Sequence, residues 1–449
     1  MAPKRFSGPK ADPAPLREPL KYEFSGRTAA NRILKGAMTE RLSTWDPKDL
    51  EKRGIPTKEL INVYKRWGQG GFGVLLTGNV MIEYDHIESP GCAIIPRGSS
   101  FSGERFDAFR TMASVAKEHG SLVIAQVSHP GRQVYGSVQK NPISASDVQL
   151  NMNRAGMWFA KPRAMEKRDI DDVIEGFAHA AEYLHGAGYD GIELHGAHGY
   201  LLAQFLSPTT NKRTDQYGGS LLNRARIILD INDAIRARVP TSFSVSIKLN
   251  SVEFQEGAFP TQDCRDLCAA LEQAEFDFVE LSGGTYEAPA FHHRKESTKK
   301  REAFFLEFAD VIVPALNKTK VYVTGGFRTA NAMVKALDTV HGVGLGRPVC
   351  DEFDLPRKIL DGKVGGAIEP LLNQADSALT NLAAGAQIRL VSKDLQPLDL
   401  SRGDHVQVFK ESRDKWLEMM ANNQDWSQYG FVDVSGIPMQ PYGTKHARL

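Results

Sequence analysis

Eight strand-like segments alternate with helix-like segments over most of this 449-residue chain, and this rhythm constrains the fold more than any other feature. Alternation of strands and helices predicts a parallel sheet, and eight strands are the number that closes a β/α barrel. Several of the strand candidates are almost entirely apolar, as strands covered on both faces are. The strand candidates are residues 33–39, 73–80, 122–128, 191–195, 243–249, 278–282, 321–325 and 342–346. Helical patterns between them include residues 106–119, 172–187, 221–239, 264–274, 304–316 and 330–337.

The alternative fold is a doubly wound open sheet, which usually carries a Gly-rich turn after its first strand. Residues 35–39 read Lys-Gly-Ala-Met-Thr, which is not such a turn. We therefore expect an α/β protein of the (β/α)8 TIM-barrel type over residues 26–365, preceded by an N-terminal arm of residues 1–25.

Two long segments do not follow the alternation of strands and helices. Residues 129–164 form an unusually long connection after the third strand, which predicts a lid over the barrel mouth. After about residue 366 the alternation ends, and helices are expected only at residues 371–384 and around 413–421. We expect residues 366–449 to be an extension packed on the barrel.

Composition excludes several classes of function. Lys plus Arg (55) nearly cancels Asp plus Glu (54), so no net field attracts nucleic acid, and no window is apolar enough for a membrane span. The four cysteines are scattered, as expected of a cytoplasmic, reducing environment. The C-terminal Ala447-Arg448-Leu449 resembles a small-basic-leucine peroxisomal signal, with an ordinary polar tail as the alternative.

The chemistry of a β/α barrel lies at the carboxyl ends of its strands. His195, His198 and Tyr200 follow the fourth strand, where neutral imidazoles can bind an electron-rich oxygen and a protonated phenol can act as an acid. Two histidines three residues apart lie on opposite faces of a regular strand. They can share a site only if the strand ends near Gly196.

Other strand ends carry groups suited to an anion. Lys248 ends an apolar strand and requires either an anionic cofactor or a structural ion pair with a carboxylate. Gly325, Gly326 and Gly346 let backbone amides approach a phosphate, and Arg347 adds a charged clamp; tight turns are the alternative for the glycines. Loops after strands seven and eight commonly hold phosphate in barrels.

With these residues placed, residues 25–365 resemble the old yellow enzyme family of FMN-dependent ene-reductases (NADH:flavin oxidoreductases). The motifs that carry the resemblance are 31–33 through 38–39, 124–126 with 129–132, the block 195–224, 325–326 and 346–347. The resemblance implies that NAD(P)H reduces a non-covalently bound FMN, which then reduces the C=C bond of an activated alkene such as an α,β-unsaturated carbonyl.

The resemblance also implies roles for individual residues. His195 and His198 would bind the substrate carbonyl, and Tyr200 would protonate the α-carbon. Lys248 would lie beside flavin N1 and O2, where an arginine is more usual in the family. The remaining flavin contacts would be Thr39 at O4, Gly78 beside the ring, Gln126 at the pyrimidine edge, and Gly325, Gly326, Gly346 and Arg347 at the phosphate.

Two alternatives remain at this stage. The enzyme could be an isomerase or biosynthetic oxidoreductase acting on one enone metabolite without net reduction, or a flavin-binding protein without turnover. Relatives with an iron–sulfur cluster require closely spaced cysteines after the barrel, and the last cysteine here is Cys350. We expect no metal site, and a homodimer is one of the states that the sequence allows.

Overall fold

The computed structural model describes residues 2–154, 157–253, 257–284, 287, 305–423 and 425–444. Its centre is a parallel barrel of eight strands, which confirms the predicted fold. The strands in barrel order are β3 (Ile33–Lys35), β4 (Val74–Leu76), β7 (Leu122–Ser128), β12 (Gly191–Gly196), β13 (Ser244–Asn250), β14 (Phe278–Ser282), β15 (Lys320–Thr324) and β16 (Gly342–Leu345). Pairing of β16 with β3 and of β7 with β12 closes the sheet.

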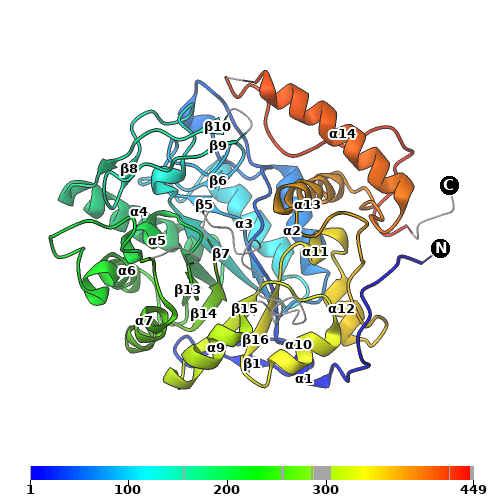
Figure 1. The fold of residues 1–449 in the computed structure, drawn as a ribbon, viewed down its shortest axis with the longest axis horizontal. Coiled ribbons are helices and arrows are strands. Elements are labelled where there is room, and N and C mark those ends of the chain that lie inside the picture. The colour runs from blue at the N-terminus through cyan, green and yellow to red at the C-terminus, as the bar shows by residue number, and fades with distance from the viewer. Residues whose placement is uncertain are drawn as a thin grey trace.

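Helices surround the strands on the outside (Figure 1). They are α2 (Lys58–Gly68), α3 (Glu104–Lys117), α4 (Lys167–Gly186), α5 (Leu201–Leu206), α6 (Leu221–Arg236), α7 (Thr261–Gln273), α9 (Leu306–Ile312), α10 (Ala330–Ala336), α11 (Pro348–Asp351) and α12 (Leu355–Leu360). The sequence analysis did not name α2, although Thr57 caps it and Leu60, Val63, Tyr64 and Trp67 form one buried face.

The first two strands are shorter than predicted, because their ends bend into the barrel mouth. The amide of Gly36 still donates to Leu345 O at 2.9 Å, but the amide of Gly78 donates to the side chain of Glu40 at 2.9 Å. Beyond the end of β4 the Gly78 amide is thus paired with a side chain, whereas beyond β3 the Gly36 amide keeps a backbone partner.

The two faces of the strands bury different kinds of side chain. Outward residues such as Val245 and Ile247 join the large core beneath the helices. Inward residues at the bottom of the barrel, including Ile124, Phe278 and Tyr322, form a separate apolar cluster with Tyr22. Tyr22 lies between β1 (Leu20–Lys21) and β2 (Thr28–Ala29), a hairpin of the N-terminal arm that packs at this end. The polar inward residues lie above this apolar layer, toward the mouth.

The long segment after β7 contains short regular elements. The 3-10 helix η2 (Gly131–Gln133) comes first, and β8 (Ile143–Ser144) pairs in parallel with β11 (Arg163–Ala164). A second pair, β9 (Asn153–Arg154) with β10 (Met157–Trp158), is antiparallel. The ring of Tyr135 stacks on Trp426 of the C-terminal region, with centroids 5.4 Å apart. This segment therefore contacts the extension as well as the barrel.

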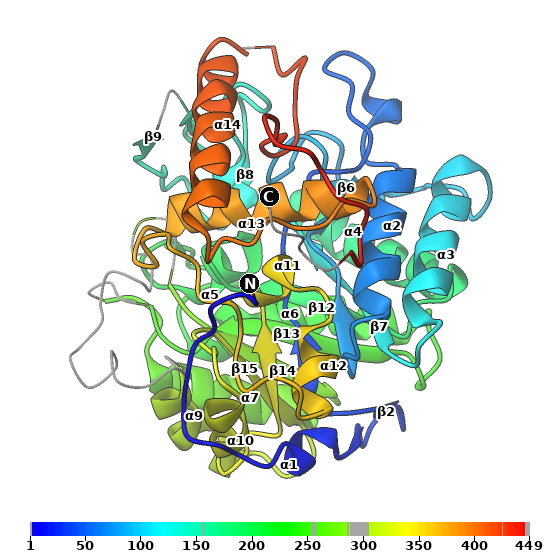
Figure 2. The ribbon, with the colours of Figure 1, turned by 90° about the vertical axis from the view of Figure 1, so that its right-hand side faces the viewer.

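The C-terminal region holds α13 (Ser377–Ser392) and α14 (Gly403–Ala421), with α14 at the outer edge (Figures 1 and 2). Both helices differ from the predicted bounds. Asp376 accepts a hydrogen bond from the amide of Leu379 and so caps α13 after its expected start. The helix then continues through Gly385, where a Cβ would lie 2.2 Å from the Phe431 ring. This glycine permits close packing and does not end the helix.

Among the described residues, no helix is both long and apolar enough to cross a membrane. The C-terminal tripeptide, residues 447–449, lies outside the described residues.

Candidate active site

His195 and His198 share one site, because β12 ends at Gly196 as the sequence requires. His198 and Gly199 then adopt positive φ angles of 58° and 77°, which turn the chain sharply. As a result, His195 Nε2 lies 3.3 Å from His198 Nδ1.

Polar residues from three other segments hold the two imidazoles. Asn79 Oδ1 lies 2.8 Å from His195 Nδ1, and Ser282 Oγ lies 3.0 Å from His198 Nε2. The amide of His198 donates to Asn250 Oδ1 at 3.1 Å. None of these three partners was predicted from the sequence. Asn250 and Ser282 are the last residues of β13 and β14, so their position at strand ends was the signal that could have found them.

Tyr200 lies in the same cluster. It is 4% exposed, and its ring centroid is 4.4 Å from that of His195. The residue directly precedes α5, and the amide of Leu201 is anchored to His129 O at 2.9 Å. The phenol therefore belongs to the histidine site and is not an exposed loop side chain.

Both histidines are neutral near physiological pH. Burial, followed by the charges of His198 and Lys248, lowers the pKa of His195 well below its usual range. Burial and Lys248 lower the pKa of His198 to about 3. Each ring therefore offers one N–H donor and one acceptor nitrogen.

Lys248 lies inside the barrel on β13, where it pairs in register with His195 of β12. Its Nζ donates to Glu280 Oε1 at 2.9 Å, and the two side chains are 5% and 0% exposed. Gln126 Nε2 donates to the neighbouring Glu193 at 2.7 Å. Burial, and then the Glu280 charge, raise the pKa of Glu193 well above its usual range. The structural ion pair considered for Lys248 is thus present. With Glu193 protonated, the three side chains Lys248, Glu280 and Glu193 together carry no net charge.

Thr39 and Gly78 lie at the mouth, near two acidic side chains. Thr39 Oγ1 donates to Glu88, whose two oxygens lie 2.9 and 2.8 Å away. A Cβ at Gly78 would lie 2.3 Å from Glu40 Oε2, so the close approach that this glycine permits is to Glu40. Tyr64 OH also donates to Glu40. No sequence motif indicated a role for Glu88.

The predicted phosphate residues lie together after β15 and β16. Gly325 and Gly326 have φ angles of 141° and 88°, a backbone shape that favours glycine. They, Gly346 and Arg347 are only partly buried, and the Arg347 guanidinium donates to Thr380 of α13. A glycine cradle beside a guanidinium fits a phosphate, and a buried ammonium at Lys248 fits the anionic edge of a reduced flavin. The residues present therefore fit FMN.

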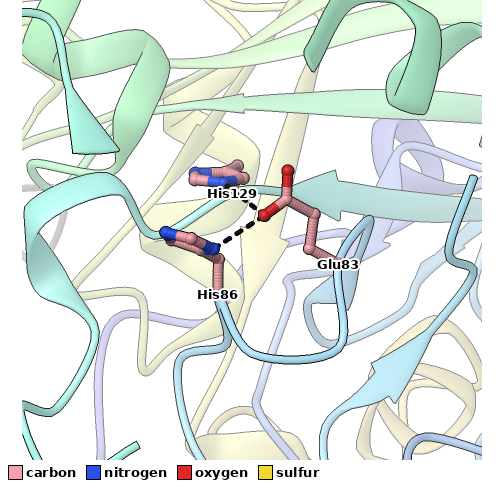
Figure 3. Close-up of side chains that lie close together, drawn as sticks. All are labelled: Glu83, His86 and His129. Atoms are coloured by element: carbon pink, nitrogen blue, oxygen red, sulfur yellow. Dashed lines mark ion pairs between the residues drawn. The ribbon is translucent and has the colours of Figure 1, made fainter. Parts of the chain in front are cut away.

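A second histidine cluster joins the connection after β5 (Val80–Met81) to the first residue after β7 (Figure 3). Glu83 Oε2 lies 2.7 Å from His86 Nδ1 and 3.5 Å from His129 Nε2. Burial opposes a charge on His86, but hydrogen bonds with Asp85 and Glu83 outweigh it and raise the pKa of His86 to about 9. The three ligand atoms are close enough to hold a metal ion.

The proton positions in this cluster favour an ion pair over a metal site. His129 Nδ1 accepts from the amide of Gly131 at 3.0 Å, so the proton of the neutral ring is on Nε2. A metal would require the lone pair of that nitrogen. That the chain uses no metal stays a prediction.

A cavity of about 720 Å³ lies between the barrel and the C-terminal helices, away from the histidine site. None of the predicted site residues lines it. Its lining combines basic and aromatic side chains, among them Arg41, Arg389, Lys393, Lys415, Trp416 and Tyr429. We assign the chemistry to the strand ends because the acid–base groups converge there.

Known proteins are similar to this chain over the residues that form the barrel. Residues 15–364 match the model of the NADH:flavin oxidoreductase / NADH oxidase family. The chain is 50% identical over 418 residues to the NADH-dependent flavin oxidoreductase of Aspergillus parasiticus, which covers 92% of this chain and 94% of that protein. It is 38% identical over 160 residues to 12-oxophytodienoate reductase 1 of Oryza sativa, covering 35% of this chain and 42% of that protein.

The solved structure of the old yellow enzyme homologue from Zymomonas mobilis has the same fold. It superposes with a TM-score of 0.63 at 21% identity and covers 78% of this chain and 94% of that chain.

Proposed function

The chain belongs to the NADH:flavin oxidoreductase / NADH oxidase family, and from this premise we propose that it is an FMN-dependent ene-reductase. Its substrate class is an activated alkene, such as an α,β-unsaturated carbonyl compound. The electron donor is NADH, the donor in the name of the Aspergillus parasiticus relative.

The observation that carries this proposal is the cluster of His195, His198 and Tyr200 at one strand end. Two neutral imidazoles can hold a substrate oxygen, and a phenol beside them can supply a proton. The same barrel mouth contains Lys248, the glycine cradle and Arg347.

When bound, FMN would supply a hydride at N5 after receiving one from NADH. Lys248 would hold the pyrimidine edge, with Glu280 keeping its ammonium in place. Gln126 would lie along the same edge, and Thr39 and Gly78 would border the ring. The phosphate would be held by the group Gly325, Gly326, Gly346 and Arg347.

Tyr200 would deliver its phenolic proton to the substrate α-carbon. This role favours net reduction over the isomerase alternative, because an isomerase would return the hydride and need no net proton donor. The burial of the phenol against His195 supports the role.

Spectroscopy and product analysis test this function together. The purified protein should contain FMN, NADH should bleach the flavin band without air, and cyclohex-2-en-1-one should restore it with cyclohexanone as the product. A protein that binds no FMN would refute the proposal. Rearranged enone without saturated product would favour the isomerase.

A further inference from the structure

The cavity between the barrel and the C-terminal helices has a positively charged lining. Its volume of about 720 Å³ is in the range of small-molecule binding sites. Its cations outnumber its two carboxylates, Glu59 and Asp433. A lining of this kind attracts an anionic ligand. The four cations are Arg41 from the barrel, Arg389 of α13, Lys393 directly after α13, and Lys415 of α14.

Two of these cations are not neutralised by a protein carboxylate. Asp433 is shared by Arg389 and Lys393, at 3.4 and 2.7 Å. Within the described part of the chain, Arg41 and Lys415 form no ion pair. Their charges are therefore available to a ligand.

Three side chains of the lining also carry a buried N–H donor that has no acceptor among the described residues. These donors are Arg41 Nε, Arg389 Nε and Trp416 Nε1. Buried donors without a partner are rare and destabilising. Phosphate oxygens are strong acceptors, and guanidinium groups bind them through short, charge-assisted hydrogen bonds. The lining therefore suits an anion rich in acceptors, such as a phosphate.

Other side chains of the same lining suit a nucleoside. The indole of Trp416 and the phenol of Tyr429 offer ring faces on which a base can stack. The carboxylate of Glu59 and the side-chain amide of Gln428 can form hydrogen bonds with sugar hydroxyls. A nucleoside phosphate thus matches the cavity in charge, in ring faces and in hydrogen-bonding groups.

The cavity approaches the barrel mouth at Arg41. This residue comes two positions after Thr39, so their Cα atoms are at most about 7 Å apart, and Thr39 is predicted to border the flavin. Packing between the mouth and the extension is close at this point, because a Cβ on Gly91 would lie 2.8 Å from both the Arg41 carbonyl group and the Tyr429 ring. A dinucleotide with its nicotinamide over the flavin can therefore extend its other half into the cavity.

We propose that this cavity binds the adenosine end of NADH. Arg41, the cation nearest in the chain to the flavin residues, would bind the diphosphate together with Lys415. Trp416 and Tyr429 would border the adenine. The inference rests on the proposed function, in which NADH is the electron donor, and it gives the C-terminal extension a role in binding that donor.

Calorimetry with ADP on the oxidised holoenzyme tests the site directly. ADP should bind, and Lys415→Glu should weaken its binding about tenfold, as expected for the loss of one charge-assisted hydrogen bond. Lys410→Glu is the matched control, because Lys410 is also an exposed lysine of α14 but does not line the cavity. Absence of ADP binding, or equal weakening in the two variants, would overturn the proposal.

Stopped-flow reduction of the flavin without alkene tests whether the site belongs to NADH. Reduced nicotinamide mononucleotide is the comparison donor, because it lacks the adenosine end. In Lys415→Glu the NADH concentration that gives half the maximal rate should rise about tenfold, whereas the limiting rate and reduction by the mononucleotide should be unchanged. An equal effect on both donors would refute the proposal.

Competition separates this subsite from an independent nucleotide site. ADP should compete with NADH in flavin reduction and should leave reduction by the mononucleotide unaffected. ADP that binds without competing with NADH would refute the proposal and identify a free nucleotide as the occupant. Failure of the proposed ene-reductase function would show separately, as a reduced flavin that cyclohex-2-en-1-one does not reoxidise.

Discussion

Replacing Lys248 by Met should destabilise the barrel strongly, because it removes the cation from a buried pair. Lys248 and Glu280 are 5% and 0% exposed, with Nζ and Oε1 2.9 Å apart. Methionine keeps most of the volume of the lysine stem, so the loss is mainly electrostatic. Removing one partner of a buried ion pair typically costs about 3–5 kcal/mol, since the remaining charge is desolvated and uncompensated.

A double-mutant cycle measures this effect. We expect Lys248→Met to lower the free energy of unfolding in urea by about 3–5 kcal/mol, and Lys248→Met/Glu280→Gln to recover most of the loss, because a neutral amide is cheaper to bury than a carboxylate. Lys320→Met is the matched control. Its ion pair with Glu23 is longer, at 3.5 Å, and Glu23 is 39% exposed, so the loss should stay below about 1 kcal/mol.

The measurement is made on the FMN-free protein as well as the loaded enzyme, because bound cofactor adds its own stability. A loss of less than about 1 kcal/mol in Lys248→Met, or strictly additive effects in the double variant, would refute the argument that the pair is coupled.

Three further outcomes concern Tyr200, Glu193 and His86. Tyr200→Phe should leave flavin reduction by NADH unchanged in stopped-flow experiments but slow alkene reduction by about 10²- to 10⁴-fold; unchanged alkene turnover would remove Tyr200 as the proton donor. Glu193 keeps its proton in the folded protein above its unfolded pKa near 4.5, so wild-type stability should fall as the pH rises above about 5. Glu193→Gln should flatten this fall by up to about 1.4 kcal/mol per pH unit in urea titrations, and parallel curves would contradict the assignment. His86, with its pKa raised to about 9, should stabilise the fold fully below pH 6.5 and lose that contribution as the pH rises through 9. The difference in unfolding free energy between wild type and His86→Asn should therefore shrink over this interval, and a constant difference would exclude His86 as the titrating group.

The barrel could be predicted from the sequence because its strands and helices leave separate apolar patterns. The outward residues Val245 and Ile247 alternate with polar inward residues, among them Lys248, yet both faces are buried. The sequence also indicated that Lys248 needs a carboxylate or an anionic cofactor. Which carboxylate it meets depends on the register between β13 and β14, which pairs Lys248 with Glu280. No local sequence pattern specifies the register between two strands.

In the C-terminal extension, too, a tertiary contact decides what the local sequence does not. The helix expected to end at residue 384 continues through Gly385, where the absence of a side chain leaves room for the ring of Phe431, 46 residues later. A propensity for ending helices was overridden by a close tertiary contact.

The direction of hydrogen bonding in the active site is a property of the whole chain of contacts and not of the histidine motif. The motif predicted two neutral imidazoles, and each such ring can carry its proton on either nitrogen. The side chains that hold the rings lie outside the motif: Asn79 after β4 contacts His195, and Ser282 at the end of β14 contacts His198. Which nitrogen of each ring is held therefore depends on strands that the motif does not contain, so the motif alone could not predict it.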